Sequence, residues 1–245
     1  MVGRTPASSV RRAARSKTVW GALSVVALFT LSACVTTPDH AVGERRLREI
    51  GNSDQAVRAR ERTEKRLRDV ARTYADRTPL SPGLVVLHDI CVSGSGPAWY
   101  FQQETTDDKV ACSMSVTVYY GADPGHMGET LAGIPLAHDD YGRRVLAYYR
   151  GEGPNPDGPK APEPTRLGRQ DRTLTWDTVR DTRPRKLIEE PYAGLVDSPP
   201  VSRVVRTPKG TTVAALRRRY GMVFSLELAS GTYYELLKNG RTRTP

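Results

Sequence analysis

The side chains best suited to acid–base or metal chemistry are the four histidines of this 245-residue chain and the carboxylates beside them. The histidines are His40, His88, His126 and His138. His88 is followed by Asp89, and His138 is followed by Asp139 and Asp140. An imidazole beside a carboxylate can act as a general acid or base, and both groups can ligate a metal ion. His88, His138, Asp139 and Asp140 are therefore the catalytic candidates that the sequence offers.

Both clusters also have a structural interpretation. Consecutive residues of a strand point to opposite faces, so His88 and Asp89 are not expected to touch. His138, Asp139 and Asp140 follow a turn-rich stretch and equally fit the N-cap and acidic first turn of a helix. The four histidines are dispersed and lack the spacing of a metal site. We predict neither a metal nor a cofactor.

The Ser/Gly segment 93–96 does not complete a catalytic set. A nucleophile elbow, G-x-S-x-G, needs glycines two residues either side of the serine, whereas Gly94 and Gly96 flank Ser95 directly. No Gly-Lys-Ser/Thr follows, so the segment is not a P-loop. It fits a turn between strands.

The amino terminus has the architecture of an export signal. Basic residues precede an apolar run from Val19 to Ala33. A helix of this length covers about 22 Å, less than the roughly 30 Å hydrocarbon core of a bilayer, so the run is short for a membrane span. An ordinary signal peptide has small residues at both −1 and −3, but here Leu31 occupies −3.

The sequence Leu31, Ser32, Ala33 and Cys34 resembles the lipobox of bacterial lipoproteins. The resemblance covers about the first 35 residues. It implies that a lipid is attached to the Cys34 thiol, that the chain is cut before this cysteine, and that the new amino group is acylated. Two or three acyl chains hold a protein stably at a bilayer, whereas one holds it only marginally. The resemblance therefore implies an extracytoplasmic protein that is anchored to the cell membrane through Cys34.

The net charge of +10 does not indicate a nucleic-acid partner, because half of it lies in the export signal. The first 34 residues contain no acidic residue and five basic ones, Arg4, Arg11, Arg12, Arg15 and Lys17. Without them the remaining chain carries only +5. We expect no binding to DNA or RNA.

The other two cysteines, Cys91 and Cys112, form an even pair once Cys34 is assigned to the lipid. In an oxidising compartment such a pair has one possible connectivity. Their spacing matches neither a CxxC redox motif nor a zinc site. We predict a disulfide between them.

Hydrophobic periodicity predicts a charged helix and a half-buried strand. In the charged stretch from 41 to 83, apolar residues fall at helical spacing, namely Leu67, Val70, Ala71 and Tyr74. From Val110 to Tyr120, apolar and mostly polar residues alternate as in a strand with one buried face. The segment from Val145 to Arg150 fits either a strand or the end of a helix that begins near Asp139.

Further strands are expected at 84–92 and 98–103, and a hairpin at 222–228 and 232–237. In a simple meander the strand at 98–103 would separate the two cysteine-bearing strands by about 9.6 Å, which exceeds disulfide reach. Either the topology is not a simple meander or Cys91 lies where its strand bends.

These patterns predict an α+β fold with a charged N-terminal helix, a mainly antiparallel β-sheet and one disulfide. The expected segments are a signal peptide (1–33), a lipidated tether (34–40), a charged helical segment (41–83), a disulfide-containing β-rich domain (84–150), a Pro/Gly-rich loop or linker (151–165) and a C-terminal β-rich part of the same domain (166–245).

The export signal and the incomplete catalytic set favour a non-enzymatic envelope lipoprotein. It would contact another envelope protein, a wall polymer or a small ligand. The alternative is an envelope hydrolase or metal-dependent enzyme that uses His88 and the cluster of His138, Asp139 and Asp140.

Overall fold

A computed structural model describes residues 42–93, 108–154, 163–169, 171–178, 187–190 and 201–244. These residues belong to one compact unit, Pro38–Pro245. Several expectations from the sequence lie outside the described residues. They are the signal peptide, Cys34, the tether, the strand at 98–103 and the part of the Pro/Gly-rich stretch at 155–162.

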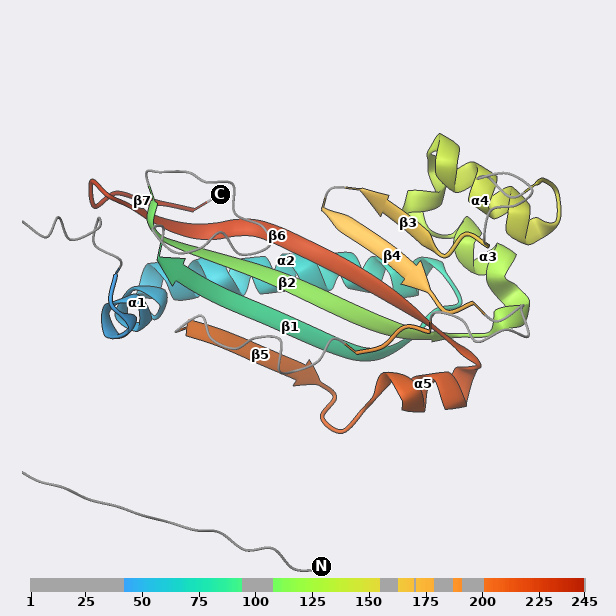
Figure 1. Ribbon diagram of the computed structural model, residues 1–245, viewed down its shortest axis with the longest axis horizontal. Helices are drawn as coiled ribbons and strands as arrows, with labels where there is room; N and C mark the ends of the chain where they lie inside the picture. Colours follow the sequence, from blue (N-terminus) through green and yellow to red (C-terminus); the bar gives the residue numbers. More distant parts are fainter. Residues whose placement is uncertain are drawn as a thin grey trace, which may run out of the picture. The chain divides into compact units, whose positions relative to one another are not determined.

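The described residues form five α-helices and a sheet of seven strands in which every neighbouring pair is antiparallel, as Figure 1 shows. The strands are β1 (Ser81–Ser93), β2 (Asp108–Ala122), β3 (Arg166–Arg169), β4 (Arg172–Trp176), β5 (Val201–Thr207), β6 (Met222–Leu237) and β7 (Thr242–Arg243). Their order is β3-β4-β6-β2-β1-β5, and β7 pairs with β6. The predicted α+β fold class is confirmed, and strands from both sides of the Pro/Gly-rich stretch share one sheet.

The charged N-terminal segment contains two helices, α1 (Glu44–Gly51) and α2 (Asp54–Arg77), and its last residues already belong to β1. The break between the helices lies at Asn52 and Ser53. Ser53 is the N-cap of α2, and its side chain accepts a hydrogen bond from the Ala56 amide. The apolar stripe of α2, which includes Leu67, Ala71 and Tyr74, is buried against one face of the sheet.

The two cysteines lie directly opposite each other on neighbouring strands. Cys91 of β1 is in register with Cys112 of β2, and their Cα atoms are 4.1 Å apart. The predicted disulfide is confirmed, and both cysteines are buried. The conflict with a simple meander is resolved because β1 and β2 pair with each other and no strand separates them.

The predicted hairpin at the carboxyl end is wrong, because β6 is one continuous strand. Its register against β2 shifts between Ala229 and Tyr234, so β6 contains extra residues at a β-bulge. Gly231 takes a positive φ of 63° there, and the Ser230 hydroxyl accepts a hydrogen bond from the Met114 amide. The sequence Ala-Ser-Gly resembles a turn, but here it forms a bulge within β6. Strand β2 pairs with β6 on both sides of this bulge.

The remaining helices lie at the other end of the sheet from α1 and β7 in Figure 1. They are α3 (Met127–Ala132), α4 (Asp140–Arg150) and α5 (Val213–Tyr220), with short 3-10 turns at Pro124–His126 and Pro135–His138. The segment from Val145 to Arg150 is therefore the end of a helix. Helix α5 covers a second, smaller apolar cluster that includes Leu84, Tyr119 and Leu216.

The unit has its own hydrophobic core, which includes the disulfide and the apolar face of α2. The described core residues all lie within Pro38–Pro245. Among the helices of the described residues, none is long and apolar enough to span a membrane.

Candidate functional site

The structure places the sequence-based candidates at two separate positions. His88 lies on β1 in register with Ser115 of β2 and Val204 of β5, and it is half-buried. His138 is exposed at the end of a 3-10 turn. That turn packs against α4 and β3, and β3 is four strand positions away from β1, about 19 Å across the sheet. His88 and the His138 cluster are therefore not brought together.

The residues after His138 begin helix α4. Asp139 is the N-cap, and its Oδ1 accepts a hydrogen bond of 2.7 Å from the Gly142 amide. Asp140 forms an exposed ion pair with Arg143. The helix-cap interpretation is thus confirmed for Asp139, whose carboxylate stabilises the first turn.

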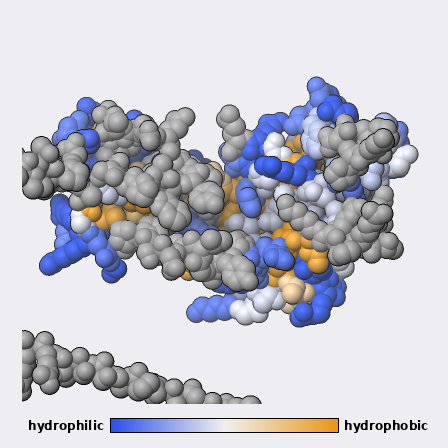
Figure 2. Space-filling view, viewed as in Figure 1, coloured by the Kyte–Doolittle hydropathy of each residue, from blue (hydrophilic) through white to orange (hydrophobic). Residues whose placement is uncertain are grey.

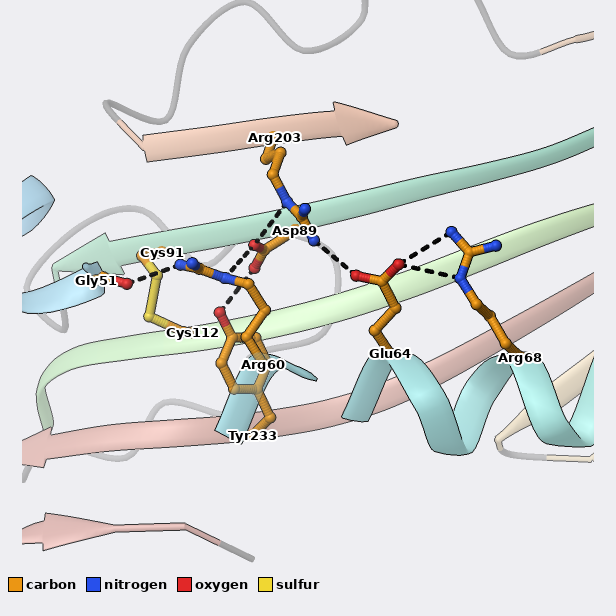
Figure 3. Close-up of polar contacts among 9 residues, drawn as sticks. All are labelled: Gly51, Arg60, Glu64, Arg68, Asp89, Cys91, Cys112, Arg203 and Tyr233. Carbon is orange, nitrogen blue, oxygen red and sulfur yellow. Dashed lines mark hydrogen bonds and ion pairs between the residues drawn. A yellow bond between two sulfur atoms is a disulfide. The ribbon is translucent and has the colours of Figure 1, made fainter. Parts of the chain in front are cut away.

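The most deeply buried carboxylate beside a predicted candidate is Asp89, which points to the opposite face of β1 from His88. Its side chain is only 3% exposed and is contacted by three groups on three elements, one hydroxyl that donates a hydrogen bond and two guanidinium groups that form ion pairs. Tyr233 of β6 donates its hydroxyl to Oδ1 at 2.7 Å. Oδ2 lies 2.7 Å from Nε of Arg60 on α2 and 3.5 Å from Nε of Arg203 on β5. Figure 3 shows these side chains converging on the carboxylate.

The network continues from Asp89 along α2. Arg203 donates to Oε2 of Glu64 at 2.8 Å, and Arg68 donates to the other oxygen of Glu64 at 3.0 Å. Arg60 also donates to the carbonyl of Gly51, at the end of α1, at 2.7 Å. Charged groups thus join α1, α2, β1, β5 and β6 through one connected set of contacts (Figure 3).

Two pKa values in this network shift for identifiable reasons. Burial raises the pKa of Tyr233, and the negative charge of Asp89 raises it further. Burial alone would raise the pKa of Glu64, but the hydrogen bonds from Arg203 and Arg68 outweigh it, so the pKa lies below its ordinary value. Both groups therefore keep their ordinary neutral-pH forms, a phenol and a carboxylate.

His88 behaves differently because no charged side chain compensates for its burial. Desolvation lowers its pKa from the ordinary value of 6.5. The imidazole is therefore held neutral at pH 7, beside hydroxyl and aliphatic neighbours on the adjoining strands.

A second buried ion pair fixes helix α5. Asp177 follows β4, is 1% exposed and receives two hydrogen bonds from Arg217, at 2.7 and 2.9 Å. The amides of Ile188 and Val223 donate to the same carboxylate at 2.8 and 2.9 Å. Figure 2 shows hydrophobic residues near α5, with further hydrophobic residues at the end of the molecule where α1 lies. Arg217, Arg218 and Arg219 form a basic run at the end of α5. The first of these arginines is structural, since its ion pair with Asp177 holds the helix in place.

The arrangement of Asp89 favours a structural clamp over a general base. Its oxygens already accept a hydrogen bond from a hydroxyl and form ion pairs with two guanidinium groups, and such pairing holds the carboxylate in place. Within the described ranges no three His, Cys, Asp or Glu side chains gather as metal ligands. The network can therefore orient α2 and β5 on the sheet.

Comparisons with protein families, with curated proteins and with solved structures found no match to this chain.

Sequence reasoning missed the partners of Asp89, although a signal for them existed. Asp89 lies within an otherwise apolar strand, where a buried carboxylate needs a cation. The sequence offers many arginines, and only the fold selects Arg60 and Arg203 from among them. Tyr233 reaches Asp89 because it is an extra residue of the β6 bulge, which strand periodicity does not predict.

Proposed function

We propose that this chain is an extracytoplasmic lipoprotein, anchored to the cell membrane through lipidated Cys34. Its folded unit serves as a non-enzymatic binding module in the cell envelope. The partner is another envelope protein, a wall polymer or a small ligand.

The observation that carries the proposal is the disulfide between Cys91 and Cys112. Disulfides persist in compartments outside the cytoplasm and are rare inside it. This one joins the central strands β1 and β2 within the core, so it is part of the folded unit. It agrees with the export signal and lipobox-like sequence at the amino terminus.

The positions of the catalytic candidates support a binding role. His88 lies on β1, whereas His138 lies in a 3-10 turn that packs against β3, four strand positions away. Asp89 is already in contact with Arg60, Arg203 and Tyr233. A chemical step that needs a paired acid and base would have to draw them from different parts of the unit.

Labelling with radioactive palmitate in host cells tests the anchor. The unaltered chain should incorporate label and should be digested by protease added to spheroplasts, whose outer surface is accessible. Cys34→Ala should abolish labelling, whereas the double variant Cys91→Ser/Cys112→Ser should retain it per molecule of protein. Label that persists in Cys34→Ala, or a chain protected from protease in intact spheroplasts, would contradict the proposal.

A further inference from the structure

Three arginines follow one another along the exposed surface of α2. Arg58, Arg62 and Arg66 are spaced four residues apart, and all three are exposed. Residues at i and i+4 are neighbours on a helix surface, so their guanidinium groups form a row over two helical turns. The opposite side of α2 is buried against the sheet. We call these three residues the arginine stripe.

The stripe is not neutralised by the acids around it. Glu64 pairs with Arg68 and Arg203, and Asp69 pairs with Lys65 and Arg72. In the part of the chain that the structure describes, none of the stripe residues has an ion-pair partner. Like charges at i and i+4 destabilise a helix by a few tenths of a kcal/mol per pair, so the stripe does not serve helix stability.

The chain length before α2 keeps the stripe near the proposed anchor. Val42, where the described fold begins, is held by a hydrogen bond from its amide to the Ser93 hydroxyl. Cys34 and Val42 are eight positions apart in the sequence, so the chain between them can span at most about 27 Å. Arg60, which lies between Arg58 and Arg62 in the sequence, donates a hydrogen bond to the carbonyl of Gly51 at the end of α1. The start of the stripe is thus close to the end of the unit where the tether enters.

We propose that the arginine stripe binds anionic phospholipid headgroups, so that α2 lies along the membrane surface to which the chain is anchored. The partner is identified by charge complementarity, since three exposed guanidinium groups match phosphate groups presented in a plane. Asp54 and Glu61 are also exposed on α2. Because these two residues are acidic, the basic stripe consists of the three arginines alone. This inference rests on the proposed function, because the anchor at Cys34 is what keeps the stripe near the membrane. The contact between the arginines and the headgroups does not itself require that the protein be acylated.

Sedimentation with lipid vesicles tests the stripe separately from the anchor. The chain from residue 38 onward, which contains all of the described core residues and carries no acyl group, is mixed with vesicles of phosphatidylglycerol and phosphatidylcholine or of phosphatidylcholine alone. It should bind the anionic vesicles only, and high salt should release it. Arg58→Gln, Arg62→Gln and Arg66→Gln together should weaken the partition coefficient about 100-fold, since each basic residue at such a surface contributes about a factor of five.

A matched variant separates the stripe from overall charge. Arg150→Gln, Arg218→Gln and Arg219→Gln remove the same charge from exposed positions on α4 and α5 and should bind almost as the unaltered chain does. Lysine at all three stripe positions should preserve binding. Circular dichroism should show the same helix content in all variants. Equal binding to both vesicle types, or equal losses in the two glutamine variants, would overturn the inference. A chain that binds vesicles but is never acylated in its host would instead refute only the anchor.

Discussion

At the scale of single residues, Asp89 forms a buried charged contact between α2 and the sheet. Its buried carboxylate faces Arg60, whose side chain is 13% exposed, and Arg203. Removing one partner from a buried ion pair leaves the other charge desolvated and unpaired, which is far more costly than losing an exposed pair. The network therefore stabilises the contact between the helix and the sheet as long as all of its members are present.

Asp89→Asn should lower the free energy of unfolding by about 3 to 5 kcal/mol, because two guanidinium groups lose their counter-charge. Urea unfolding measures the change. Asp140→Asn is the control, since its ion pair is exposed and should contribute little. Equal effects of the two substitutions would show that the Asp89 network is not structural.

His88 should make stability decrease as the pH falls below its unfolded pKa of 6.5. Burial lowers its pKa in the folded chain, so the unfolded chain takes up the proton at a higher pH. Its stabilisation is complete above the unfolded pKa of 6.5 and is lost as the pH falls toward the lower folded pKa. His88→Gln should flatten this part of the stability profile, measured by urea unfolding at several pH values. His126→Gln, at an exposed position, should leave the slope intact, and an unchanged slope in His88→Gln would refute the assignment.

At the scale of elements, close backbone contacts position the short helices. Gly142 lies in the first turn of α4, where an added Cβ would come within 2.5 Å of the Leu136 carbonyl oxygen and of the Ala137 Cα. Both are backbone atoms of the preceding 3-10 turn, so they cannot move aside as a side chain would. The contact fixes the angle at which α4 leaves that turn.

Gly142→Ala should therefore destabilise the protein by about 1 to 3 kcal/mol, although alanine is the better helix former. Gly128→Ala in α3 is the matched change, because its Cβ would come closest to the flexible side chain of Arg150, at 3.3 Å, and would lie at an ordinary contact distance of 3.9 Å from the Tyr149 carbonyl oxygen. That variant should be neutral or slightly stabilised. Thermal unfolding compares the two, and a stabilised Gly142→Ala would contradict the packing described.

The disulfide should contribute about 3 kcal/mol to stability, since it closes a loop between residues 21 positions apart in the sequence. Urea unfolding with and without reductant measures this contribution. The double variant Cys91→Ala/Cys112→Ala should match the reduced protein within error. No effect of reductant would mean that the cysteines are already reduced in the purified protein.

At the scale of the folded unit, the sequence predicts the parts that follow from local periodicity. The alternation around Cys112 and Met114 gives β2, and the helical spacing of Leu67, Ala71 and Tyr74 gives the buried side of α2. The pairing of Cys91 with Cys112 follows from the number of cysteines. The two elements are predictable because their patterns involve residues close together in the sequence. The disulfide is predictable because only two cysteines remain once Cys34 is assigned to the lipid.

Long-range contacts are the parts that the sequence does not reveal. The bulge that carries Gly231 resembles a hairpin turn until β2 is seen to pair with both halves of β6. The partners of Asp89 come from α2, β5 and β6, and no local pattern selects them. The candidate site therefore required the tertiary structure, whereas the proposed anchor depends on the amino-terminal sequence alone.

Intact mass spectrometry of the protein extracted from membranes of its own host tests the central claim most directly. The account predicts a chain that begins at an acylated Cys34 and becomes about two daltons heavier on reduction, as one disulfide opens. A full-length chain without acyl groups, whose mass does not change on reduction, would contradict both the anchor and the extracytoplasmic location.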